Sequence, residues 1–359
     1  MAVPRVVRIL ERLCQQPTAS FHEHLIRAEA AAIAQRFGGS ARTDPHGNLI
    51  VAPPGRRRGP AIWLVAHMDH PGLEVTGRGE GRLLGGIGAA YLRRGVRLRL
   101  YRDGEAVPAH LLRFSPRTRR IRFGGTPESR RLRRGDFGVF ELEDFHLARD
   151  RVQARQLDDL AGCAVSLAAV ERACAHGTSN VRALLTRAEE VGFVGTLAAA
   201  EAGVIPKNAW VVSVEASRAI PGVEVGGGPV IRVGDRARTF DAVAENLLVA
   251  ARDRLPKSKP VQRFLMSGGT CEATPWSLFG YRCTGVAIPL ENYHNMGPRN
   301  RLAPEAVAVK DLSIAVDLIE LAARGAWAGR TRDDALRARV SRYLRTYGGR
   351  LRATAPKPL

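Results

Sequence analysis

Long apolar runs, paired cysteines and lysine are scarce in this sequence of 359 residues. No apolar run approaches the roughly 20 residues of a membrane-spanning helix, so we expect no membrane partner. The opening segment MAVPRVVRILERLCQQ is charged throughout and lacks the apolar region of a signal peptide. The five cysteines show no CxxC spacing, which indicates free thiols in a reducing compartment. These absences predict a cytoplasmic protein.

Lysine supplies only five of the 55 basic residues, and the other 50 are arginine. Against 35 acidic residues they give a formal net charge of +20, and arginine is densest over residues 113–134 and 330–352. A nucleic acid or another anionic partner would be attracted by this charge. However, neither segment interleaves aromatic residues as single-strand binders do. We therefore interpret the charge as solvated surface and disfavour a nucleic-acid partner.

Alternating strand and helix patterns indicate an α/β protein with a mostly parallel sheet flanked by helices. The buried strands are expected at 49–53, 61–66, 181–186, 209–214 and 283–289, and helices at 24–37, 160–175, 194–202 and 305–326. Between residues 71 and 155, short alternating runs separated by Gly, Pro and Asp predict a small all-β domain inserted into the α/β domain. The predicted division is a discontinuous catalytic domain at 1–70 and 156–328, the insertion at 71–155 and a basic tail at 329–359.

Polar residues follow the predicted strands where their carboxyl ends would share one edge of the sheet, the usual ligand-binding edge. His67, Glu189, Glu190, Glu215 and His294 occupy such positions, and an Asp158-Asp159 pair precedes a helix. Each feature alone is more often structural or solvent-exposed. Together, two imidazoles and at least three carboxylates could hardly be buried without a cation.

The number of side chains fits two divalent metal ions, with one shared carboxylate and a further His and carboxylate for each ion. Imidazole with carboxylate suits zinc, and also cobalt or manganese. Such a pair of metals can activate water and polarise a carbonyl. In an extended segment Glu190 would face a metal while Glu189 faces the substrate and transfers a proton. Asp69, two residues beyond His67, would orient that imidazole.

Several stretches match one family in order: VAHMDHPGLEV, QLDDLAGCAV, TRAEEVGFVGT, VVSVEAS, SGGT and AIPLENYHN. On these residues, the chain to about residue 325 resembles the co-catalytic dimetal aminopeptidases of the tetrahedral, dodecamer-forming type, which include glutamyl aminopeptidases and endoglucanase-like proteins. The resemblance implies N-terminal trimming of short peptides by a self-compartmentalising homo-oligomer, for which a dodecamer is one candidate form. It implies that the metal ligands are His67, Asp158 (bridging), Glu190, Glu215 and His294. It also implies that Glu189 is the general base and that Asp69 orients His67.

The chain departs from the family pattern around the expected substrate pocket. Glu215 stands where Asp is usual, Cys271-Glu272 follows SGGT, and Glu291 begins the stretch before the last histidine. We consider Glu272 and Glu291 as candidates to bind the substrate's α-amine. The FHEH stretch, which contains Glu23, looks like a metal site but is interpreted as a capping and surface feature.

The sequence is also compatible with three other functions. A dimetal N-acyl-amino-acid deacylase or carboxypeptidase would keep the metals and change the substrate, although such enzymes usually carry an α/β insertion. A non-catalytic protein that binds anionic partners would explain the charge, but the complete set of site residues argues against it. A glycosidase would use two carboxylates and leave the histidines without a role.

Overall fold

The computed structural model describes residues 3–55, 61–177, 180–325 and 332–355. Its main sheet has eight strands in the order β1-β2-β12-β3-β13-β16-β14-β15, of which β12, β3, β13 and β16 are neighbours and parallel. The strand bounds are β1 Ser40–Thr43, β2 Leu49–Ala52, β3 Ile62–His67, β12 Val181–Thr186, β13 Trp210–Arg218, β14 Val230–Asp235, β15 Gln262–Met266 and β16 Arg282–Leu290. The carboxyl ends of the four parallel strands therefore lie at one edge.

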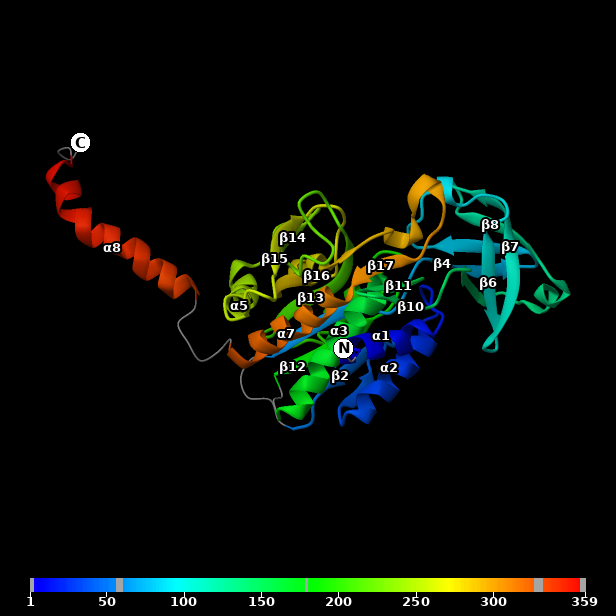
Figure 1. Cartoon of the computed structure of the whole chain (residues 1–359), viewed down its shortest axis with the longest axis horizontal. Coiled ribbons are helices and arrows are strands. Elements are labelled where there is room, and N and C mark those ends of the chain that lie inside the picture. The colour runs from blue at the N-terminus through cyan, green and yellow to red at the C-terminus, as the bar shows by residue number, and fades with distance from the viewer. Residues whose placement is uncertain (1–2, 56–60, 178–179, 326–331, 356–359) are drawn as a thin grey trace.

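Helices cover both faces of this sheet, and one of the two layers is seen in front of the strands in Figure 1. Both faces of the sheet are apolar and must be covered, as strand β3 illustrates. Its Leu64 packs into the core on one face, and its Trp63 and Val65 pack into the core on the other. One face carries α1 (Arg5–Cys14), α2 (His24–Arg36), α3 (Leu157–Ala175), α5 (Ala242–Arg252) and α7 (Val309–Gly325), and the other carries α4 (Val194–Glu201) and α6 (Ala273–Leu278). The predicted α/β fold with a mostly parallel, helix-flanked sheet is confirmed.

The inserted all-β domain is a closed barrel with strands in the order β4-β5-β8-β7-β6-β9, and it has its own apolar core. Its strands are β4 Gly72–Gly77, β5 Glu80–Leu84, β6 Arg97–Arg102, β7 Glu105–Ser115, β8 Arg120–Gly125 and β9 Phe137–Phe140. Strands β10 (His146–Ala148) and β11 (Arg151–Ala154) do not join it, because β11 pairs with β17 (Glu305–Ala308). We therefore propose that the insertion ends between β9 and β10, earlier than residue 155.

Two elements near the C-terminus differ from the simple helix-and-tail prediction. The segment expected to be one helix over 305–326 begins as strand β17 and continues as α7. Within the predicted basic tail, residues 332–353 form helix α8 (Arg332–Ala353), which extends away from the body in Figure 1. Residues 326–331 and 356–359 lie outside the described residues. None of the described helices is long and apolar enough to cross a membrane.

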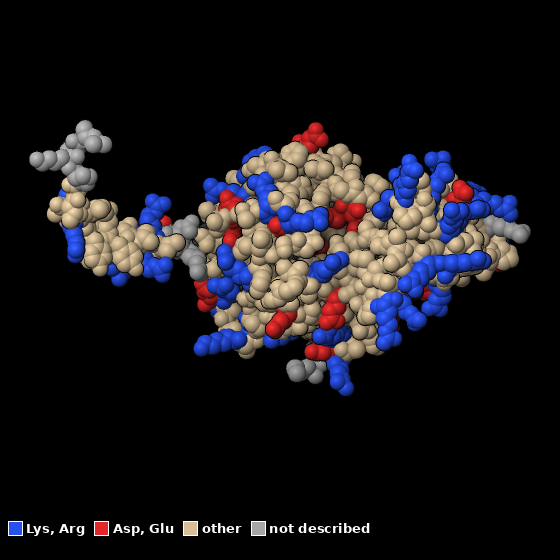
Figure 2. Space-filling model, turned by 90° about the horizontal axis from the view of Figure 1, so that it is seen from above, with Lys and Arg blue, Asp and Glu red and all other residues tan. Residues whose placement is uncertain are grey.

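The basic charge is distributed unevenly over the surface. On the face shown in Figure 2, Lys and Arg side chains gather over the barrel, whereas Asp and Glu are sparse there. Acidic side chains appear mainly over the α/β body, which contains the predicted site. The barrel and the body thus present different charge to a ligand approaching this face.

Candidate metal centre

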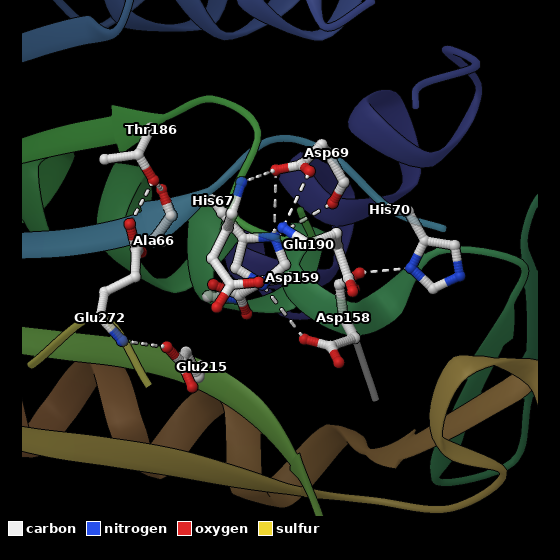
Figure 3. A network of polar contacts seen from close by, with 12 residues as sticks. Ala66, His67, Asp69, His70, Asp158, Asp159, Thr186, Glu190, Glu215 and Glu272 are labelled. Carbon is white, nitrogen blue, oxygen red and sulfur yellow. Dashed lines mark hydrogen bonds and ion pairs between the residues drawn. The ribbon is translucent and has the colours of Figure 1, made fainter. Parts of the chain in front are cut away.

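The carboxyl-end edge of the sheet brings the predicted residues together. His67 is the last residue of β3 and lies beside Thr186, the last residue of β12, in the parallel register. The loop after β12 carries Glu189 and Glu190, and Glu215 lies in β13. Parallel pairing therefore converts positions far apart in the sequence into one cluster, seen from close by in Figure 3.

Asp158 lies between the two histidines. Its Oδ1 is 3.4 Å from His67 Nε2, and its Oδ2 is 3.4 Å from His294 Nε2. Glu190 Oε1 is 2.9 Å from the same His294 nitrogen, while Glu189 Oε2 is 3.8 Å from His67 Nε2. One ligand atom each from Asp158, Glu190 and His294 lies within 4.8 Å of the others, a spacing that can hold one metal ion. His67, Glu189 and Glu190 form a second such group.

Both imidazoles are oriented by backbone carbonyls. His67 Nδ1 is 3.1 Å from the carbonyl oxygen of Asp69, and His294 Nδ1 is 2.5 Å from that of Gly86. Because a carbonyl oxygen only accepts hydrogen bonds, each Nδ1 carries the proton and donates it. Each Nε2 is then the nitrogen left to bind a metal, and both Nε2 atoms face Asp158.

The negative charge of the cluster favours a cation at these nitrogens. Burial lowers the pKa of His67, but the carboxylates of Glu189 and Asp158 raise it by more, so that its net pKa lies well above the ordinary value. His294 behaves in the same way beside Glu190 and Asp158. Buried carboxylates around nitrogen donors are the donor set that zinc and related divalent ions use. The residues present therefore fit a divalent metal ion.

Asp69 holds the loop that carries the two glutamates. Its Oδ1 accepts a hydrogen bond of 2.9 Å from the amide of Glu189, and its Oδ2 accepts bonds of 3.2 Å from the amide of Glu190 and 2.7 Å from the hydroxyl of Ser20. The carboxylate also lies 3.6 Å from His67 Nδ1. Asp69 thus lies beside His67, but two of its three hydrogen bonds come from the loop amides, a role that the sequence did not indicate.

Glu305 is a positioning residue that the sequence analysis missed. Its fully buried carboxylate accepts hydrogen bonds from the amide of His294 at 2.8 Å and from the amide of Asp158 at 2.9 Å. His294 has a left-handed backbone with φ of 54°, which is strained for a non-glycine residue. One carboxylate therefore fixes two predicted ligands, and the only signal in the sequence was an acidic residue within an apolar segment.

Glu23 corrects the interpretation of FHEH as a capping and surface feature. Its side chain is fully buried and makes no capping bond to α2. One carboxylate oxygen accepts from the amide of Ala188 at 2.9 Å, and the other is 2.7 Å from Arg187 Nε. Glu23 therefore supports the start of the loop that carries the glutamates.

The remaining candidates, Glu291, Glu272 and Glu215, belong to neither group of metal-ligand spacing among the described residues. Glu291 forms an exposed ion pair of 2.6 Å with Arg151 and does not line the cavity beside the cluster. Glu272 is fully buried, and its Oε1 accepts a hydrogen bond of 2.5 Å from Thr186. Glu215 does line the cavity, but its carboxylate lies 2.9 Å from Arg232 and belongs to neither group of metal-ligand spacing among the described residues.

Comparison with known proteins identifies the family. A sequence profile of the M42 glutamyl aminopeptidases matches residues 125–310, more than half of the chain. The chain therefore belongs to the M42 glutamyl aminopeptidase family. M42 peptidases are dimetal enzymes, so the chain is a metal-dependent exopeptidase that acts at peptide N-termini.

Solved structures of aminopeptidases share the fold over nearly the whole chain. The TET1 peptidase of Pyrococcus horikoshii, which can assemble into a tetrahedron or a large octahedral shell, is 22% identical with a TM-score of 0.74, over 89% of this chain and 99% of that one. An aminopeptidase from Desulfurococcus kamchatkensis is 22% identical with a TM-score of 0.71, over 88% and 93%. The TET aminopeptidase of a marine-sediment Thaumarchaeota archaeon is 19% identical with a TM-score of 0.75, over 89% and 96%.

Proposed function

We propose that this aminopeptidase binds divalent metal at His67, Asp158, Glu190, Glu215 and His294, with Asp158 shared between two positions. The observation that carries the proposal is the location of Asp158, whose two oxygens each lie 3.4 Å from a histidine Nε2. When bound, divalent ions polarise the scissile carbonyl and lower the pKa of water.

Glu189 is the general base in this proposal. Its side chain is 13% exposed, against 4% for Glu190, so Glu189 is the more open of the two adjacent glutamates that line the cavity. Burial and the neighbouring carboxylates raise the pKa of Glu189 well above its ordinary value, so this group has a greater affinity for a proton than an ordinary glutamate. Glu189 would take a proton from the attacking water and deliver it to the leaving amine.

The cavity also suits a free N-terminus. Of the acidic side chains that line it, Glu189 is the one not assigned to a metal ion, and its carboxylate can attract the α-ammonium of a peptide. An acetylated N-terminus has no such charge. We therefore propose peptides with free N-termini as substrates, and neither Glu272 nor Glu291 as the amine-binding residue.

We further propose zinc as the metal, a homo-oligomer as the working form and the cytoplasm as the location. Imidazole with carboxylate suits zinc, with cobalt and manganese as alternatives. Helix α8 exposes a row of apolar side chains that a partner subunit could cover, namely Leu336, Val340, Tyr343, Leu344, Tyr347 and Leu351. All five cysteines are free, in keeping with a reducing compartment.

Peptide trimming followed by mass spectrometry tests the proposal. The protein is stripped of metal, refilled separately with zinc, cobalt or manganese, and incubated with peptides that differ only in a free or acetylated N-terminus. We expect stepwise loss of residues from free N-termini alone, and no loss with the Glu189→Ala variant. Cleavage of the acetylated peptides, or full activity of the variant, would contradict the assignment.

A further inference from the structure

Both oxygens of the Glu215 carboxylate already accept hydrogen bonds from protein donors. Its Oε2 is 2.9 Å from Arg232 Nη1, and its Oε1 accepts hydrogen bonds from the amide of Glu272 at 3.0 Å and from the hydroxyl of Ser213 at 3.1 Å. Figure 3 shows the Glu215 carboxylate turned towards the amide of Glu272 and not towards Asp158. A metal ion that takes Glu215 as a ligand must therefore compete with an arginine for the same oxygens.

Arg232 reaches Glu215 across a neighbouring strand. Arg232 of β14 pairs with Gly285 of β16, and Gly285 in turn pairs with Ser213 of β13. A Cβ atom at position 285 would lie only 2.9 Å from Arg232 Cδ, so a glycine leaves the space through which the arginine side chain passes. Arg232, Gly285 and Ser213 thus lie side by side on adjacent strands, and the Arg232 side chain passes over Gly285 to reach β13.

The guanidinium is a buried cation with Glu215 as its close partner. Only 2% of the Arg232 side chain is exposed, and the same Nη1 also donates to Ser217 Oγ at 3.1 Å. Its Nε has no hydrogen-bond partner among the described residues. A buried charge is costly unless it is paired. A second cation that binds Glu215 must separate it from Arg232, and the cost of leaving Arg232 unpaired opposes that binding.

We propose that Arg232 is a built-in counter-ion for Glu215 and makes the two metal positions unequal. One divalent ion binds tightly at Asp158, Glu190 and His294, where no arginine intervenes. A second ion binds weakly at His67 and Glu215, because it must displace Arg232. This inference rests on the proposed ligand set and adds to it a residue that governs metal stoichiometry.

Metal titration of the intact protein tests the inference, with zinc content and isothermal titration as readouts that do not depend on catalysis. The wild type is expected to keep one zinc ion per chain after dialysis and to bind a second at least about tenfold more weakly. In Arg232→Met, which keeps an apolar stem over Gly285, the second ion should bind about 10- to 100-fold more tightly than in the wild type, the range expected for removing a charged hydrogen bond.

Two further variants separate the pairing from general effects of charge and folding. Arg218→Met removes another cavity-lining arginine, one that lies 4.9 Å over the Tyr293 ring, and should leave the second ion weak. Gly285→Ala keeps every charge but crowds Arg232, and should strengthen the second ion in the same direction as Arg232→Met. It also provides the test if Arg232→Met does not fold.

The outcomes distinguish this inference from the function on which it rests. Two zinc ions of similar affinity in the wild type, lost together with His294→Ala, would keep the metal centre and overturn the role of Arg232. The same would follow if Arg232→Met and Gly285→Ala both titrated like the wild type. Absence of zinc binding by the wild type would overturn the ligand set itself, and the inference with it.

Discussion

Replacing Asp69 by Asn should damage the site through the loop and not through the metal ligands directly. The carboxylate accepts three hydrogen bonds, from the amides of Glu189 and Glu190 and from Ser20. An amide side chain has only one accepting oxygen, so at least one partly buried backbone amide loses its partner, at a cost of about 1–3 kcal/mol. The remaining bonds lose charge assistance, about 1 kcal/mol more, so we expect a stability loss of about 2–4 kcal/mol.

The same change should displace Glu189 from its productive position. A shift of the general base lowers kcat/KM by about 100-fold, whereas the protein keeps zinc, because Glu305 and not Asp69 holds the ligands Asp158 and His294. The assay combines thermal unfolding, zinc content and peptide kinetics, with Ser20→Ala as the matched control. That control removes one bond to Asp69 without touching the loop, so it should cost about 1 kcal/mol and little activity. An Asp69→Asn enzyme with kcat/KM within about twofold of the wild type would refute the reasoning.

Three further predictions follow from the site. Glu189→Gln should lower kcat by about 100- to 10,000-fold while the zinc content measured by mass spectrometry stays unchanged, and loss of zinc would instead make Glu189 a ligand. Burial raises the pKa of Glu272 to about 7 from 4.5, so the folded metal-free protein holds this proton more tightly than the unfolded chain. Its stability should fall by up to about 3 kcal/mol as pH rises from about 4.5 to 7, and urea titrations of Glu272→Gln should lack this slope. Native mass spectrometry should show a defined multiple of the chain mass, and a monomer at micromolar concentration would contradict the proposed homo-oligomer.

The strands and helices with strong apolar patterns could be predicted from the sequence. The apolar run at 181–186 is strand β12 to the residue, because a strand buried on both faces needs a continuous apolar segment. The structure of the first residues of segment 305–326 could not be predicted in this way, because Ala306 and Val307 fit a helix or a strand equally well. Pairing of β17 with β11, which lies far away in the sequence, decides in favour of the strand.

The side chains around the metal ligands could not be predicted in the same way. The proposed metal ligands lie at or after the carboxyl ends of strands, so their positions can be inferred from the edge of the sheet where these ends meet. Glu305 and Glu23 act through backbone amides, and no local pattern distinguishes such a carboxylate from a solvated one. Arg232 was hidden for a different reason, because its pairing with Glu215 depends on strand order and on the space above Gly285.

The most direct test of the metal centre is a crystal structure with anomalous scattering recorded at the zinc edge. We expect a strong peak bound by Asp158, Glu190 and His294, and a weaker one beside His67. A zinc peak elsewhere, or none at this cluster in protein that trims peptides, would contradict the proposed centre.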